Sequence, residues 1–355
     1  EANTINFNAV NATNNDSIIG DNVTLNLSGN YTYSFTPYEI NPFLKNKFIN
    51  KSKYFEWLKE FNLNLTPSSI SVNSKIDRIF NSQKFREVYL ENINIEDQIS
   101  MPDLQQRNYR FDVTYAINHN ISRSLRLNFT SSTNNIVKNY FLDKGEDIDR
   151  VDKEKNIWDG LWNSGDPDRH HQSLNLNYSI PFKHFPFLSF IEANYSYTGD
   201  FSWERGSEVL EGVKSTKGDV LGIVNTIQNA NTKTLNGSIS INQLYRNLGF
   251  DNSKKNKSFF ESLIKGLTKI ERIQFTYSEN NGTVLPGYLQ SIGIIGTSDP
   301  SLGYVFGSQS DIRYEAARKG WITSFPDFNQ AFTQIHNNQF NISGQLNFGA
   351  GLLID

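Results

Sequence analysis

The side chains best suited to chemistry in this sequence are histidines and clustered carboxylates. The most compact group is GDPDRHH, in which Asp166 and Asp168 precede His170 and His171. Imidazole nitrogens and carboxylate oxygens together suit a transition metal. Adjacent residues of an extended chain point to opposite faces, so the two imidazoles are not expected to converge on one ion. The remaining histidines are isolated in the sequence: His119, His184 and His336.

Other signatures of catalysis or metal binding are missing from the sequence. One acidic run lacks the glycine and the ligand spacing of a calcium loop; it consists of Glu146, Asp147, Asp149, Asp152 and Glu154. The G-x-S-x-G elbow of hydrolases and the G-x-x-x-x-G-K phosphate loop do not occur. With no cysteine, the chain has no disulfide framework, thiolate metal site or cysteine nucleophile. We therefore predict that the protein is not an enzyme and uses no metal or cofactor.

Charge and hydropathy narrow the possible partners. The formal net charge is -3, and the only short basic run is Lys254, Lys255 and Lys257, so nucleic acid is not expected as a partner. No run of 18 apolar residues occurs, which excludes a transmembrane helix. The mean hydropathy of -0.51 fits a soluble protein. It fits an outer-membrane barrel equally well, because such strands alternate apolar and polar residues.

A period of two dominates the chain and runs longer than a soluble strand requires. Every second residue from Val23 to Phe35 is apolar or glycine, and the even positions from Phe340 to Ile354 repeat the pattern. Strands of globular proteins average about 5 to 6 residues, whereas membrane-crossing strands need about 9 to 11. Both runs are therefore long enough to cross a membrane.

Further alternating runs lie between these two, and together they predict about nine strands. A run from Phe61 to Leu65 changes parity after Pro67 and continues to Ile76, which predicts either a bulge in one bent strand or a turn. The other alternating runs span residues 109–117, 125–129, 174–180, 191–197, 235–241 and 273–277.

The connections between these strands fall into two classes. Every second connection is long and polar, namely 77–108, 132–172, 199–234 and 278–338, and we expect these on the extracellular side. Residues 37–60 and 242–270 carry compact amphipathic pieces around Trp57 and Phe259, which we expect on the periplasmic side, capping a barrel rim. The predicted fold is all-β: antiparallel transmembrane barrel strands with long loops on one side and short turns on the other.

The side chains on the two faces of the alternating strands provide candidate lipid-facing and lumen-facing residues. Aromatic residues near strand ends are typical of the lipid-facing girdles of membrane barrels; here they are Tyr31, Tyr33, Phe35, Tyr195, Tyr197, Phe275 and Tyr277. The intervening positions are mainly Asn, Thr and Ser, as in a wet lumen. Candidate lumen-facing residues are Asn26, Thr32, Asn175 and Asn236.

The two ends of the sequence bear on how such a sheet would close. An open sheet edge in hydrocarbon leaves backbone groups unpaired at several kcal/mol each, so a barrel must close. The last strand lacks a terminal aromatic residue, and no export signal precedes the first strand. Nine or ten strands would close only if the first and last paired. We therefore expect the chain to be an internal segment of a much larger barrel.

Several collinear strings resemble one family. They are FNLNLTPSSISV at 61–72, SLRLNFTSSTNNIVKNY at 124–140, PFLSFIEANYSYTGDFSWERGS at 186–207, NTIQNANT at 225–232, LPGYL at 285–289, LGYVFGSQSDIR at 302–313 and GWIT at 320–323. In order and content they resemble the C-terminal region of the SprA family, gliding-motility cell-surface proteins of Bacteroidota.

This resemblance implies a transport function in the bacterial outer membrane. Family members form the translocon of the type IX secretion system, a very large single-chain barrel that exports folded cargo proteins to the cell surface. The largest known barrels have about 36 strands, and barrel diameter grows with strand number. The resemblance also implies two partners, the barrel protein PorV and a periplasmic plug protein, but no motif here marks their contacts.

Two alternatives remain at the level of sequence. A smaller nutrient-uptake barrel, such as a porin or part of a TonB-dependent transporter, predicts a binding site of loop residues such as Trp158, Trp162 and Trp203. A soluble carbohydrate-binding module or envelope enzyme predicts that the odd-numbered side chains from Val23 to Phe35 are buried against a second sheet.

Overall fold

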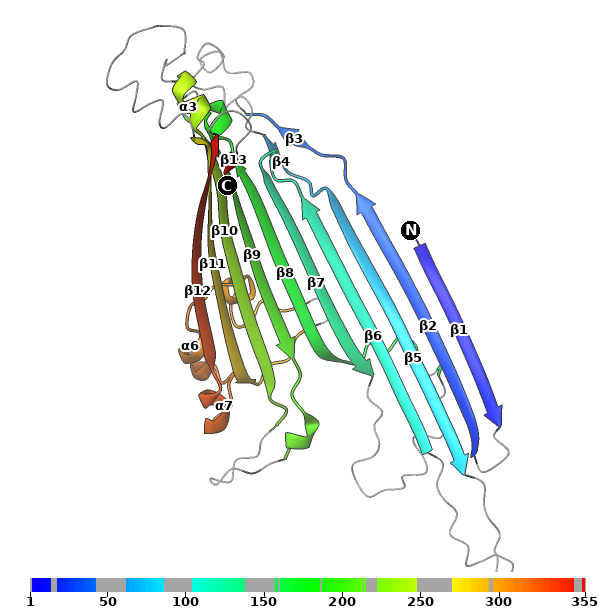
Figure 1. Cartoon of the computed structure of the whole chain (residues 1–355). Helices are drawn as coiled ribbons and strands as arrows, with labels where there is room; N and C mark the ends of the chain where they lie inside the picture. The colour runs from blue at the N-terminus through cyan, green and yellow to red at the C-terminus, as the bar shows by residue number, and fades with distance from the viewer. Residues whose placement is uncertain are drawn as a thin grey trace, which may run out of the picture.

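A computed structural model shows an all-β chain dominated by one antiparallel sheet of 11 strands. The residues that the structure describes are 2–13, 18–42, 62–85, 104–137, 157–158, 160–185, 187–212, 214, 222–247, 270–293, 296–347 and 353–354. Figure 1 shows the strands side by side in a single layer, seen face-on at one end of the sheet and almost edge-on at the other. The sheet is therefore curved.

The strands of the large sheet follow one another in sequence order, so the chain runs up and down as a meander. All neighbouring pairs are antiparallel. The strands are β1 (Ala2–Thr13), β2 (Ile18–Ser34), β5 (Ser69–Phe85), β6 (Leu104–His119), β7 (Leu125–Val137), β8 (Asp166–Ile180), β9 (Ile191–Glu204), β10 (Asn225–Ser240), β11 (Ile270–Tyr288), β12 (Thr333–Asn347) and β13 (Leu353–Ile354).

Short elements lie at the ends of the sheet. A separate two-stranded sheet pairs β3 (Glu39–Ile40) with β4 (Leu63–Asn64) between β2 and β5. The helical elements are η3 (Phe182–His184), η4 (Glu208–Leu210), α3 (Ile241–Asn247), α5 (Leu302–Val305), α6 (Arg313–Arg318) and α7 (Pro326–Gln330). Figure 1 places α3 at one end of the strands, and α6 and α7 at the other.

The strands extend well into the predicted long connections. The segments 77–108, 132–172, 199–234 and 278–338 each begin and end with strand residues, so those loop boundaries were wrong; β11, for instance, continues to Tyr288 and β12 starts at Thr333. In β8, β10 and β11 the reason is that polar residues such as Gln172, Asn229 and Asn281 interrupt the apolar alternation before the strands end. In β9 the alternation itself continues through Phe201 and Trp203.

Two other local predictions are settled by the structure. Residues 2–13 form β1, a strand that the sequence reasoning missed, although β1 pairs with β2 along its whole length. At Pro67 the chain bends between β4 and β5, so the second alternative, a turn, is correct. The predicted amphipathic pieces around Trp57 and Phe259, the basic run at Lys254 and the acidic run at Glu146 lie outside the described residues.

The sheet is open in the part of the chain that the structure describes. β1 and β13 lie at opposite edges, and no pairing joins them. Among the described residues, no second sheet lies against the side chains of β2: Tyr31 and Tyr33 are each 51% exposed, and Leu25 is buried under a loop. The burial expected for a soluble sandwich is therefore not found at this strand.

Candidate functional site: the two faces of the sheet

The strand register assigns the side chains of the sheet to two faces. Directly paired residues of an antiparallel sheet, and alternate residues of one strand, share a face. One row of partners runs from Tyr33 through Ile70, Ile117, Phe129, Leu174 and Gly199 to Asn231 and Asn281. We call the face that bears this row the belt face, and the opposite one the polar face.

All the predicted girdle residues within strands lie on the belt face. Tyr31 and Tyr33 of β2, Tyr195 and Tyr197 of β9, and Phe275 and Tyr277 of β11 occupy the half of each strand nearer α3. Phe35 directly follows β2, with its ring centroid 4.7 Å from that of Tyr33 in an edge-to-face contact. The structure thus brings these aromatic residues to one face and one end of the sheet.

The predicted lumen residues Asn26, Thr32, Asn175 and Asn236 all lie on the polar face. Neighbouring strands are linked there by hydrogen bonds between neutral side chains. The Thr198 hydroxyl donates to Asn175 Oδ1 (2.8 Å), and the Thr276 hydroxyl donates to Asn236 Oδ1 (2.9 Å). These hydrogen bonds join neighbouring strands across the polar face.

One shallow apolar depression interrupts the polar face toward the α6 end. It has a volume of about 220 Å³ and is lined by Ala230, Gly282, Val284 and Ile335, with Asp200 and His171 at its edge. Small side chains at paired positions of β10 and β11 create the hollow.

The apolar residues of the belt face form a band that slants across the strands. The row of partners that starts at Tyr33 reaches Gly199 in β9 and Asn281 in β11. In β9 and β11, the aromatic residues of the band are instead Tyr195 and Phe275. They lie four and six residues from that row of partners, toward α3. A strand rises by about 3.3 Å per residue, and neighbouring strands lie about 4.8 Å apart. Both offsets therefore give an angle of about 30° between the apolar band and the perpendicular to the strands.

The band has a limited height. In β2, eight residues separate Tyr33 from Leu25, which lies under a loop; in β11, eight residues separate Phe275 from Thr283, which donates to Gln309 of another loop (2.7 Å). Eight residues span about 26 Å along a strand, or about 23 Å along an axis tilted by 30°. Beyond this height in β2 and β11, loops that fold back onto the sheet cover the belt face; at β9 the cover begins higher, because the Tyr197 hydroxyl donates to Phe306 O.

The larger of these loops, residues 289–293 and 296–332, is here called the cover segment. Its turn at 304–308 is held by side chains of the sheet that donate to backbone carbonyls. Asn229 Nδ2 donates to Tyr304 O (3.0 Å) and Ser308 O (2.7 Å), and Gln172 Nε2 donates to Val305 O (3.3 Å). The remaining two carbonyls of the turn accept from the Tyr197 hydroxyl and from Asn231 Nδ2.

Close backbone approach also shapes this turn. Gly307 has a φ of 94°, a left-handed conformation that favours glycine. At Gly199, a Cβ atom would lie 2.4 Å from the carbonyl oxygen of Phe306. Both glycines therefore allow the turn to lie flat on β9 and β10.

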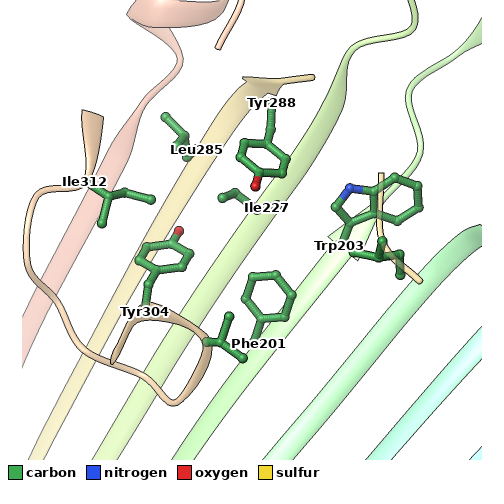
Figure 2. Close-up of a cluster of buried hydrophobic side chains, with 9 residues drawn as sticks. Phe201, Trp203, Ile227, Leu285, Tyr288, Tyr304 and Ile312 are labelled. Carbon is green, nitrogen blue, oxygen red and sulfur yellow. The ribbon is translucent and has the colours of Figure 1, made fainter. Parts of the chain in front are cut away.

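An apolar cluster fixes the rest of the cover segment to the sheet (Figure 2). Phe201, Trp203 and Ile227 are at most 2% exposed and pack with Tyr304 and Ile312 of the cover segment. The Trp203 indole also donates to Gln290 O (3.0 Å). Burial of this cluster stabilises the cover segment on the sheet. The hydrogen bonds from Gln172, Asn229 and Asn231 determine where along the strands the segment lies.

Two buried tyrosine hydroxyls in this cluster have no hydrogen-bond partner among the described residues. Tyr304 is fully buried and Tyr288 is 2% exposed, and Figure 2 shows their rings close together between β11 and the cover segment. Burial raises the pKa of the Tyr304 hydroxyl above its usual range, so it stays protonated. A buried hydroxyl without a partner carries a desolvation cost.

Replacing Tyr304 with phenylalanine should therefore stabilise the fold. Removing an unpaired buried hydroxyl while keeping the ring is expected to raise the free energy of unfolding by about 1 kcal/mol. Urea unfolding followed by circular dichroism measures the change. A fall in stability would show instead that the hydroxyl is hydrogen-bonded in the folded protein.

A second, shorter loop covers the belt face over β2, β5 and β6. This short cover comprises residues 157–158 and 160–165, and Ile157 packs with Leu25 and Tyr109. The guanidinium of Arg78, itself 1% exposed, donates to Ile157 O (2.8 Å) and to Gly160 O, and lies 4.8 Å from the centre of the Tyr109 ring. One buried cation thus holds two carbonyls of the loop.

The histidines and tryptophans singled out in the sequence do not form a site. His170 is buried on the belt face and His171 is exposed on the polar face, as the extended chain predicted. Within the described ranges, no group of three His, Cys, Asp or Glu side chains is placed to hold a metal ion. Trp203 is 2% exposed under the cover segment, whereas Trp158 and Trp162 belong to the short cover, so the predicted tryptophan site is not assembled.

The residues that dock the two covers were missed at the level of sequence. Gln172, Asn229 and Asn231 occupy positions where apolar residues would continue the alternation, and Arg78 does the same in β5. Interrupted alternation inside a continuing strand is the signal that identifies such positions. Read alone, it looks like the start of a loop.

Comparisons with known proteins do not assign the chain to a family: no family model and no curated protein matches it. Among the described helices, none is long and apolar enough to cross a membrane.

Proposed function

We propose that this sheet is part of the wall of a large outer-membrane β-barrel that conducts proteins, as in the SprA-type translocon of the type IX secretion system. The part of the belt face that no loop covers contacts lipid, and the polar face lines the protein-conducting channel. The end that carries α6 and α7 is extracellular, because the cover segment and other long connections leave the strands there. The protein has a transport role and no catalytic one.

The observation that carries this proposal is the slant of the apolar band. A membrane is flat, so a band of lipid-facing residues crosses tilted strands obliquely. The slant of about 30° is close to the tilt of about 35–45° found in barrels, and the height of about 23 Å is close to the usual band of about 25 Å. A soluble sheet has no reason to shift its apolar residues steadily from strand to strand.

The polar face fits a path for protein cargo. It presents mainly neutral Asn, Thr and Ser side chains that bond to each other across strands, such as Thr232 to Asn280 (2.9 Å). Such a surface holds water and offers few strong contacts to a moving chain. Exported cargo, a PorV-like barrel and a periplasmic plug are proposed as partners on the family resemblance alone.

The strings that carry the resemblance also act together in the fold. LPGYL ends β11, LGYVFGSQSDIR forms the docked turn with α5, and GWIT pairs with the end of β11 through the bridge between Tyr288 and Ile322. Three strings that are separate in sequence therefore build one structure, the cover segment on its strand. This joint role supports the resemblance.

Cysteine labelling of β12 tests the proposal, because the native chain has no cysteine. Asn341 on the polar face and Ile342 on the belt face are adjacent, and both are exposed in the isolated chain. In lipid vesicles that hold the complete barrel with this segment in place, we expect a water-soluble maleimide to label N341C rapidly and I342C at least about tenfold more slowly. In urea, both should label at the same rate.

Equal labelling of the two cysteines in vesicles would contradict the membrane assignment. So would a complete barrel that stays in solution without lipid or detergent and fails to float with vesicles in a density gradient. Labelling of I342C alone would show that the two faces are assigned the wrong way round.

A further inference from the structure

The short cover presents two outward tryptophans at the margin of the belt. Trp162 is 81% exposed and Trp158 is 52% exposed, whereas Ile157 and Leu161 of the same loop face the sheet. The loop is pinned: Arg78 holds the carbonyls of Ile157 and Gly160, and Asn163 N donates to Gly160 O (2.9 Å).

The short cover lies at the margin of the apolar band opposite to the one that bears the aromatic group. It rests on Leu25 and Tyr109, about 26 Å along β2 from Tyr33 in the aromatic group at the other margin. The bare apolar surface between the two levels includes Tyr31 and Val72, which are 51% and 40% exposed. Aromatic residues therefore mark both margins of the band, with tyrosines at one margin and tryptophans at the other.

We propose that Trp158 and Trp162 anchor the wall in the lipid headgroup layer at the extracellular margin of the belt. Indole rings favour this layer, because the ring is apolar while its N–H bonds to water or headgroups. The short cover positions the anchor, since its inward residues and Arg78 fix the height at which the two indoles project. This inference rests on the proposed membrane location.

Tryptophan fluorescence in vesicles that contain brominated phosphatidylcholine tests the anchor. The variant W158F/W162F should lose at least about half of the quenching that the brominated lipid causes in the native chain. The matched control is W203F, which removes an indole buried under the cover segment; its loss should leave the lipid-quenched part unchanged. Iodide in the buffer should quench Trp162 less in vesicles than in urea.

The outcomes separate this inference from the proposed function. If the chain floats with vesicles but W158F/W162F leaves lipid quenching unchanged, the anchor is wrong and the membrane location stands. If iodide quenches both indoles as freely in vesicles as in urea, the pair lies in water, which also overturns the anchor. A complete barrel that does not float with vesicles overturns both.

Discussion

Replacing Val72 with arginine is expected to prevent stable insertion of the sheet into lipid. Val72 lies in the bare part of the belt face, 40% exposed, and pairs with Tyr31 on one side and Tyr115 on the other. An arginine on the lipid face near the bilayer midplane costs about 2–4 kcal/mol. We expect the unfolding free energy in vesicles to fall by that amount, with a matching loss of the fraction that floats with lipid.

The neighbouring residue provides the control. Asn73 points to the polar face and is exposed. Asn73→Arg should change stability by about 0.5 kcal/mol or less, as surface substitutions usually do. If the two arginine variants insert and unfold alike, the belt face is not in contact with lipid.

Removing the guanidinium of Arg78 should release the short cover. Arg78→Leu keeps an apolar contact with Tyr109 but removes both hydrogen bonds to the loop. Charge-assisted hydrogen bonds contribute about 1.5–3 kcal/mol each, so we expect the free energy of unfolding to fall by about 3 kcal/mol. The fall cannot exceed the free energy that holds the loop on the sheet. Limited proteolysis should then cut between residues 157 and 165, and lipid quenching of the two tryptophans should fall.

Lys75 is the control for this charge. It lies on the polar face of the same strand, 50% exposed, in an ion pair with Asp77. Exposed ion pairs contribute about 0–1 kcal/mol, so Lys75→Leu should leave both the proteolysis pattern and the loop unchanged. Unaltered protection of the loop in Arg78→Leu would mean that the apolar contact of Ile157 holds the loop by itself.

The sequence alone determined the repeating part of this protein. An alternation as long as that from Val23 to Phe35 specifies a strand and separates its two faces, because side chains of a strand alternate strictly. The same rule placed Asn26 and Tyr33 on opposite faces and kept His170 apart from His171. These properties are local, so they can be predicted without knowing which strands are neighbours.

Only the tertiary structure decided where each strand ends and what lies over it. β11 continues through Asn281 and Thr283 because these polar residues form hydrogen bonds to Asn231 and Gln309, and no local pattern reveals those contacts. The register across strands revealed the slant of the belt, since a slant exists only between strands. Docking of the loops by Asn229 and Arg78 joins residues about 80 positions apart, and only the folded sheet brings them together.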